Sequence, residues 1–234
     1  MKRAILVISA GLMLMCLSAE AQYVIEPCVE GTARWHAYRN FYHTYSGGSH
    51  SRGTDHYYGS PGTFKAGWVF TSSAWGSGGA WGRSSTLDHF QPVIEFHLND
   101  TTGGSQFPLS QLTSNNFSAH LMGIQAGDVS GEDTSNLIEL YQLPVEQTDG
   151  VLTKEDHAGQ YGDFQYLATL WQGKPEDYSI VDPIDVTKAL KVNLFGVETT
   201  DRIGFAIDKW DYDLDGYQIN IPIQQNAVRL QINI

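Results

Sequence analysis

The sequence has only two cysteines, so disulfides contribute little or nothing to its stability. Cys16 lies in an apolar N-terminal run that we expect to be removed on export, which leaves Cys28 as the single thiol of the mature chain. A single cysteine cannot form an intrachain disulfide. It either pairs with another chain or is buried as a small apolar side chain, the commoner fate. Stability must therefore come from the core, with or without help from a metal.

Long apolar runs are also lacking. The longest, residues 4–17, is shorter than the ~20 residues that span a bilayer. It follows the basic pair Lys2-Arg3 and precedes a small-x-small cleavage site, so residues 1–21 are predicted to be a signal peptide. A lipid anchor on Cys16 is disfavoured, because residues 13–15 lack the small side chains of a lipobox. We expect a secreted, periplasmic or cell-surface protein of residues 22–234, and the short basic start is typical of bacteria.

Basic residues are scarce. The chain has 14 Lys and Arg against 26 Asp and Glu, a formal net charge of −12, which becomes −13 when Lys2, Arg3 and Glu20 are removed with the signal peptide. Proteins bind nucleic acid largely through Lys and Arg that neutralise phosphates. We therefore expect no nucleic-acid partner. The acidity favours solubility, and some of the carboxylates are candidates for cation binding.

Catalytic signatures are absent as well. The sequence has neither the G-x-S-x-G turn of a hydrolase nor an H-E-x-x-H zinc motif. Four of the eight histidines lie at scattered positions over residues 36–56: His36, His43, His50 and His56. We predict a non-catalytic protein. A polysaccharide lyase or glycosidase stays open as an alternative, because the groups of such a site meet only in space.

Regular alternation is what the sequence does have. In its last third, apolar residues recur at every second position over residues 203–207, 217–223 and 228–234. That period is typical of half-buried β-strands. From residue 92 onward, shorter alternating runs are bounded by Gly, Asn, Asp or Pro. The pattern predicts an all-β fold, an antiparallel β-sandwich of jelly-roll type, as a single domain over residues 22–234. Two domains that divide near Phe90 are the alternative.

One short helix is predicted within this β-pattern. Residues 183–196 place Asp185 at a helix start, an Ala-Leu-Lys centre and Gly196 at the end. We expect the helix near residues 185–195 to close one end of the sandwich.

The segment over residues 35–90 differs from the rest. It is rich in Gly, Ser, Thr and aromatic residues, with few aliphatic ones. The aromatic spacing over residues 34–45 predicts one or two helical turns. Glycines further along predict short strands and loops, with residues 63–72 as the best strand.

Aromatic residues in Gly- and Ser-rich sequence indicate a carbohydrate-binding surface, since exposed rings stack on the apolar faces of sugars. We expect Trp68 to be buried in a strand because Val69 and Phe70 follow it. An aromatic cluster buried under the loops is the alternative reading. The candidate carbohydrate-binding residues are Trp75, Trp81, Trp210, Tyr57 and Tyr58.

An acidic loop lies between the first two runs of the last third. Asp211, Asp213 and Asp215 alternate before Gly216, so their carboxylates could converge on a hard cation such as Ca²⁺. The loop is no EF-hand, because Pro222 stands at the twelfth position, where a Glu is needed. We predict Ca²⁺ as the cofactor, with Asp208 as a candidate further ligand and Asp182 or Asp185 as more distant ones. A plain acidic hairpin loop in solvent is the alternative.

Five short segments carry a resemblance to a known family: VIEFHL at 93–98, SAHL at 118–121, IDVTKAL at 184–190, GFAI at 204–207 and VRLQI at 228–232. Their order resembles exported bacterial β-sandwiches of the DNRLRE kind, whose fold also forms the body of proteins carrying a PEP-CTERM sorting tail. The resemblance covers residues 90–234. Some members of this fold are carbohydrate-binding modules, so it implies recognition of a polysaccharide.

The sequence thus predicts an exported protein that binds polysaccharide or a cell-surface glycan, stabilised by calcium and without catalysis. A structural component of an extracellular matrix or surface layer, self-associating through sheet edges, aromatic residues or Cys28, is the second hypothesis. A polysaccharide-degrading enzyme is the third.

Overall fold

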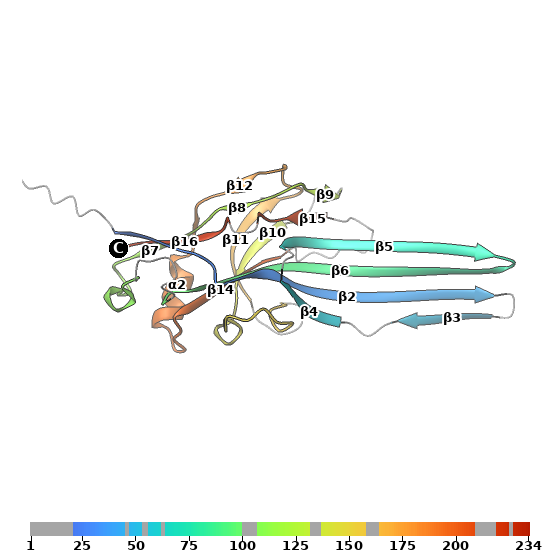
Figure 1. The fold of residues 1–234 in the computed structure, drawn as a ribbon, viewed down its shortest axis with the longest axis horizontal. Helices are drawn as coiled ribbons and strands as arrows, with labels where there is room; N and C mark the ends of the chain where they lie inside the picture. Colours follow the sequence, from blue (N-terminus) through green and yellow to red (C-terminus); the bar gives the residue numbers. More distant parts are fainter. Residues whose placement is uncertain are drawn as a thin grey trace, which may run out of the picture.

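The structure is a computed structural model that divides into a β-sheet body and a long arm (Figure 1). It describes residues 21–44, 47–52, 56–61, 64–99, 107–131, 137–157, 164–208, 219–224 and 227–234. The predicted signal peptide up to residue 20 and the acidic loop over residues 209–218 lie outside the described residues.

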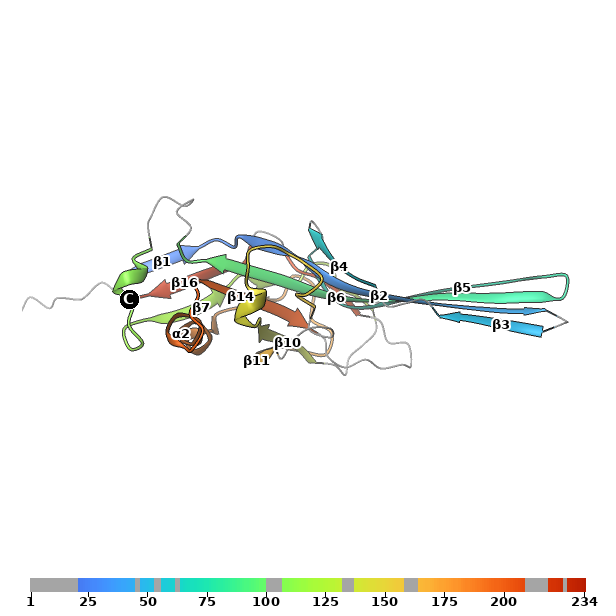
Figure 2. The ribbon, with the colours of Figure 1, turned by 90° about the horizontal axis from the view of Figure 1, so that it is seen from below.

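The arm is built on three long antiparallel strands. β6 (Ala80–His97) is the central strand, with β2 (Val29–Thr44) on one side and β5 (Lys65–Ser77) on the other. The shorter strands β3 (Gly47–Arg52) and β4 (His56–Pro61) both pair with β2. Seen from below, the arm is a thin sheet that extends well beyond the body (Figure 2).

Local chemistry explains both ends of the β5–β6 hairpin. Gly78 and Gly79 form its two-residue turn with φ of +58° and +86°, the left-handed values that a type I′ turn requires at both positions. At the base, pairing with β6 ends at Gly67, whose φ is +115°. On its other side, β5 pairs over residues 65–68 with β15 (Ile219–Pro222), and the Lys65 amide donates to the Thr32 hydroxyl at 3.3 Å.

Within the described residues, the body contains three sheets. The smallest pairs β8 (Ile124–Gln125) with β12 (Ile180–Val181). A four-stranded sheet has the order β1 (Gln22–Ile25), β16 (Arg229–Asn233), β7 (Ser118–Met122) and β13 (Ile184–Asp185). The large sheet shared with the arm has the order β11 (Gln165–Gln172), β10 (Leu137–Gln142), β14 (Arg202–Asp208), β6, β5, β15 (Ile219–Pro222) and β9 (Ser130–Gly131). All the pairings are antiparallel, so the predicted all-β fold is confirmed.

The main core lies between these sheets, and strand alternation creates it. In β7 and β16 every second side chain is buried. Leu121 and Ile232 thereby meet Ile94, Phe96 and Phe205 of the large sheet, all of them at most 1% exposed. Burying each such side chain contributes about 1.5–3 kcal/mol.

A smaller apolar cluster lies on the opposite face of β6. It joins Ala33, Val93, Leu143 and Ala206, and Leu152 and Phe164 pack against it. Residues 143–157, which include the 3₁₀ turn η2 (Val145–Gln147), supply Leu143 and Leu152 to this cluster. A second 3₁₀ turn, η1 (Leu109–Gln111), lies at the end of the body away from the arm (Figure 1).

The predicted helix is confirmed as α2 (Thr187–Phe195). The Asp185 carboxylate accepts a hydrogen bond from the Thr187 amide at 2.9 Å, which satisfies a donor at the helix start. Ala189 and Leu190 pack into the main core. Gly196 ends the helix where a Cβ would come within 2.3 Å of the Val192 carbonyl oxygen.

Two expectations about the N-terminal segment are wrong. Residues 34–45 do not form helical turns, because residues 34–44 belong to the 16-residue strand β2. The glycine-rich sequence that follows is also not limited to short strands, since β5 has 13 residues and β6 has 18. Pairing of β2 with β6 outweighs the helical spacing of the aromatic residues in β2.

Cys28 is not buried, although burial is the commoner fate of a cysteine outside a disulfide. It is exposed just before β2, and its thiol donates to the Glu95 carbonyl at 3.4 Å.

Candidate binding surface of the arm

Trp75 and Trp81 are both highly exposed on the arm, at 52% and 47%. Trp75 lies opposite Gly82, and Gly76 opposite Trp81. Directly paired residues share a face and successive residues alternate between faces. The two tryptophans therefore lie on opposite faces of the arm, which we call the Trp75 face and the Trp81 face.

A flat aromatic pair occupies the Trp75 face. Gly82 is flanked by Tyr42 on β2 and Trp75 on β5. A Cβ on Gly82 would stand only 2.6 Å from Cε2 and Cζ2 of Trp75, so the indole ring lies directly over the glycine. Its centroid is 5.5 Å from that of Tyr42, with 37° between the planes. Tyr42 is 41% exposed, so the two rings form one open surface with a free outer side.

Polar side chains continue this face toward the body. The Ser84 hydroxyl donates to Asn40 at 2.8 Å, and Tyr38 follows two positions further along β2 with 36% of its surface exposed. The other positions of this face, assigned by register, are Thr71, Ser73 and Thr86. Hydroxyl and amide groups next to aromatic rings are the combination that a sugar-binding surface needs.

Charged groups lie at the base of the Trp75 face. The Asp88 Oδ1 atom accepts from Arg34 Nε at 2.8 Å and Nη2 at 2.6 Å, and His36 Nδ1 lies 2.6 Å from it. Lys65 Nζ and Arg34 Cζ lie 3.8 and 5.0 Å from the centroid of the Phe90 ring. Burial lowers the pKa of Lys65, the positive charge of Arg34 lowers it further, and Asp88 opposes both.

A buried histidine cluster lies at the base of the Trp81 face. His89 Nε2 is 2.6 Å from the Asp208 carboxylate, and the His89 ring stacks on Trp68 at 4.0 Å. Trp35 contacts Trp68 edge-on, and His157 contacts His89 edge-on. Burial lowers the pKa of His157 to about 3, assisted by the charge of His89. Sequence reasoning missed this cluster, because no spacing along the chain joins residues 89, 157 and 208.

Two buried carboxylic acids, Glu95 of β6 and Asp156, accept hydrogen bonds from backbone amides of residues 143–157. Glu95 accepts from the Gly150 amide at 2.9 Å, and Asp156 from the Thr153 amide at 2.6 Å. Burial raises the pKa of Glu95 to about 7 and that of Asp156 to about 6, and nearby carboxylates add to both shifts. Both residues are at most 1% exposed, so a polymeric substrate does not reach them in this conformation.

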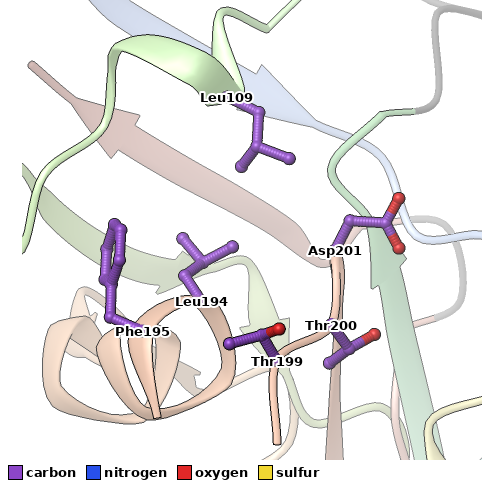
Figure 3. A pocket seen from close by; sticks show the side chains of 6 residues that line it. All are labelled: Leu109, Leu194, Phe195, Thr199, Thr200 and Asp201. Carbon is purple, nitrogen blue, oxygen red and sulfur yellow. The ribbon is translucent and has the colours of Figure 1, made fainter.

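A pocket of about 280 Å³ lies between η1 and the end of α2 (Figure 3). Its lining residues are Leu109, Leu194, Phe195, Thr199, Thr200 and Asp201. The Asp201 carboxylate is already engaged by Asn99 at 2.6 Å and His97 at 3.1 Å. These hydrogen bonds lower its pKa against the opposing effect of burial. The lining thus combines three apolar side chains with two threonines and one satisfied carboxylate, and it contains no pair of catalytic groups.

The remaining predicted residues are placed only in part. Tyr57 and Tyr58 lie on β4, where they pair with Trp35 and Arg34 of β2, and their side chains lie outside what the structure describes. Trp210 falls within the undescribed residues 209–218.

The predicted metal ligands Asp211, Asp213 and Asp215 also lie outside the described residues. Among the residues that are described, no group of three or more His, Cys, Asp or Glu side chains is arranged to hold a metal ion. Asp208, the candidate further ligand, is buried and paired with His89, which removes it from a loop site in this conformation.

Comparisons with known proteins return no match: no family model, no curated protein and no solved structure is similar to this chain. The resemblance to exported DNRLRE-type sandwiches therefore stays a prediction. In the described part of the chain, no helix has the length and apolarity needed to cross a membrane.

Proposed function

We propose that this protein is an exported, non-catalytic glycan-binding protein and that the Trp75 face of the arm is its binding surface. The observation that carries the proposal is the flat placement of Trp75 over Gly82, beside Tyr42. A ring held against the sheet turns its other side to solvent. That side matches the C–H face of a sugar ring, and it needs no rearrangement before binding.

The shape of the arm supports a polymeric ligand. Strands β2 and β6 pair without a break over residues 29–43 of β2, which gives a long, open surface and no enclosed pocket. An extended polysaccharide can lie along such a surface and contact several positions at once. Glu95 and Asp156, the two carboxylic acids whose pKa values burial raises, are buried away from this surface. Their position favours binding over bond cleavage.

Binding is tested by calorimetric titration of the mature chain with a panel of acidic and neutral polysaccharides. Gly82→Ala is the decisive variant, because its new Cβ would overlap the Trp75 ring at 2.6 Å and force it off the sheet. All aromatic residues are kept in this variant. We expect affinity to fall about fivefold, the equivalent of an aromatic contact of about 1 kcal/mol, and Trp75→Ala to lose at least as much.

Gly76→Ala is the matched control on the Trp81 face. Its Cβ would meet the nearest atoms of Trp81 and Ala80 at 3.5 and 3.6 Å, which are ordinary contacts. We expect its affinity to be unchanged. The proposal fails if the chain binds none of the glycans, or if the two alanine variants behave alike. Release of new reducing ends from the panel would favour the enzyme hypothesis instead.

The open edge of β5 favours a second candidate, a structural protein that self-associates. Among the described strands, none pairs with the outer edge of residues 69–77. Natural edge strands often carry proline or charged residues, which prevent pairing with other chains. Residues 69–77 contain neither.

Light scattering behind a sizing column tests this candidate, with Ser72→Lys and Ala74→Lys as edge-blocking variants. A wild-type dimer or larger assembly that the lysines dissociate would support it. A monomer at every concentration would exclude it.

A further inference from the structure

Charge is segregated between the arm and the rest of the chain. Residues 29–97, which include the strands of the arm, contain five basic residues, Arg34, Arg39, Arg52, Lys65 and Arg83, and four acidic ones, Glu30, Asp55, Asp88 and Glu95. The rest of the chain has nine basic and 22 acidic residues. The segment that forms the arm thus has a formal charge of +1 in a protein whose net charge is −12.

The basic side chains at the base of the Trp75 face are presented outward. The side chains of Arg34 and His36 are 27% and 26% exposed, whereas the Asp88 carboxylate that joins them is only 11% exposed. Asp88 therefore orients the two basic side chains from beneath, and an incoming ligand meets them first. Lys65 adds a second cation over the neighbouring Phe90 ring.

The aromatic pair and the cations lie on one face, at a distance that only a polymer can bridge. Tyr42 and Arg34 are eight residues apart on β2, which corresponds to roughly 27 Å along a strand. Tyr38 lies between them on the same face. A single sugar reaches one end or the other, whereas an extended chain contacts the rings and the cations together.

We propose that the Trp75 face binds an anionic polysaccharide, whose sugar rings stack on Tyr42 and Trp75 and whose carboxylate or sulfate groups meet Arg34 and Lys65. This inference rests on the proposed function and adds the class of glycan to it. The acidic body repels the same polymer, so charge confines binding to the arm.

The test compares polymers that differ in charge alone. Polygalacturonate is compared with its methyl ester, and dextran sulfate with dextran, by titration of the mature chain at rising salt concentration. We expect the two anionic polymers to bind more tightly than their neutral partners, and the difference to shrink as salt screens the charges.

Two charge-removing variants locate the effect. Lys65→Gln should weaken binding of polygalacturonate about three- to fivefold at low salt, in the range of an exposed ion pair, and leave the methyl ester unaffected. Arg83→Gln, an equal loss of charge at a position that register assigns to the Trp81 face, is the matched control and should change affinity less than twofold. Circular dichroism melts establish that both variants are folded.

Each contrary result has a distinct meaning. Equal affinity for charged and neutral partners overturns the inference and leaves the glycan-binding function standing. Absence of binding to all four polymers overturns both. Equal weakening by Lys65→Gln and Arg83→Gln, or equally tight binding of duplex DNA, reduces the effect to non-specific attraction and overturns the inference. Salt-sensitive self-association without polymer binding overturns it as well and assigns the basic arm to the acidic body of a second copy.

Discussion

Replacing Glu95 by Gln should make the protein less sensitive to pH. Glu95 is fully buried, its Oε2 atom accepts from the Gly150 amide, and its Oε1 atom has no hydrogen-bond partner among the described residues. Burial raises the pKa of this carboxyl group from 4.5 to about 7. The folded protein therefore holds a proton that the unfolded chain releases between these two pH values.

The sign and size of the effect follow from proton linkage. Because the folded state binds more protons than the unfolded state over this window, the Glu95 contribution is fully present below about pH 4.5 and is lost as the pH rises to about 7. A shift of that size corresponds to about 3 kcal/mol. Gln keeps the size of the side chain and an acceptor for the Gly150 amide, but it has no titrating proton.

Urea denaturation followed by circular dichroism from pH 4.5 to 8 measures the free energy of unfolding. Relative to Glu95→Gln, we expect the wild type to lose about 3 kcal/mol across this range, a shift of roughly 1–2 M in the urea midpoint. Glu146→Gln, an exposed residue of η2, is the control and should run parallel to the wild type. If the Glu95→Gln curve is also parallel, the carboxyl group is not buried as described.

Three further predictions concern stability and access. His89→Phe keeps a ring on Trp68 but leaves the buried Asp208 carboxylate without its hydrogen-bond partner at 2.6 Å, so it should cost about 3 kcal/mol in urea denaturation, and replacing Asp208 by Leu in the same chain should recover part of the loss. Chelator should lower the melting temperature if the acidic loop binds Ca²⁺, because an ion bound only to the folded state stabilises it; an unchanged melting temperature excludes the site. Cys28 is exposed, so a maleimide should label it in the native protein as fast as in urea, and protection of the thiol would contradict its position.

The body was predictable from sequence where buried and exposed residues alternate along a strand, as in β7, β10 and β16. In β16, Leu230 and Ile232 are buried while Arg229, Gln231 and Asn233 are partly exposed, which is the alternation that the sequence displays. Helix α2 was predictable for the same local reason, since Asp185 and Gly196 mark its two ends.

The arm was not predictable, because its strands do not bury one face. Residues 71–79 are all exposed, so hydrophobic alternation is missing and only strand pairing fixes the conformation. The helical spacing of aromatic residues in β2 was therefore misleading. The Gly-Gly pair at residues 78 and 79 was the local signal of a long hairpin, since it fits a two-residue turn.

The candidate surface was predictable residue by residue but not as an arrangement. Exposure of Trp75 and Trp81 followed from their Gly- and Ser-rich surroundings. Their separation onto opposite faces depends on the β5–β6 register, and the ring of Trp75 lies flat only because Gly82 stands opposite it.

The continuity of β6 from tip to body has a mechanical consequence. The strand runs unbroken from Ala80 to His97, with Ile94 and Phe96 locked in the core. A pull on the distal hairpin is therefore transmitted along one covalent backbone into the main core. The hydrogen bonds to β2 and β5 lie across that direction, so tension loads many of them in shear at the same time. A force along the arm is thus resisted by the whole set of backbone hydrogen bonds together.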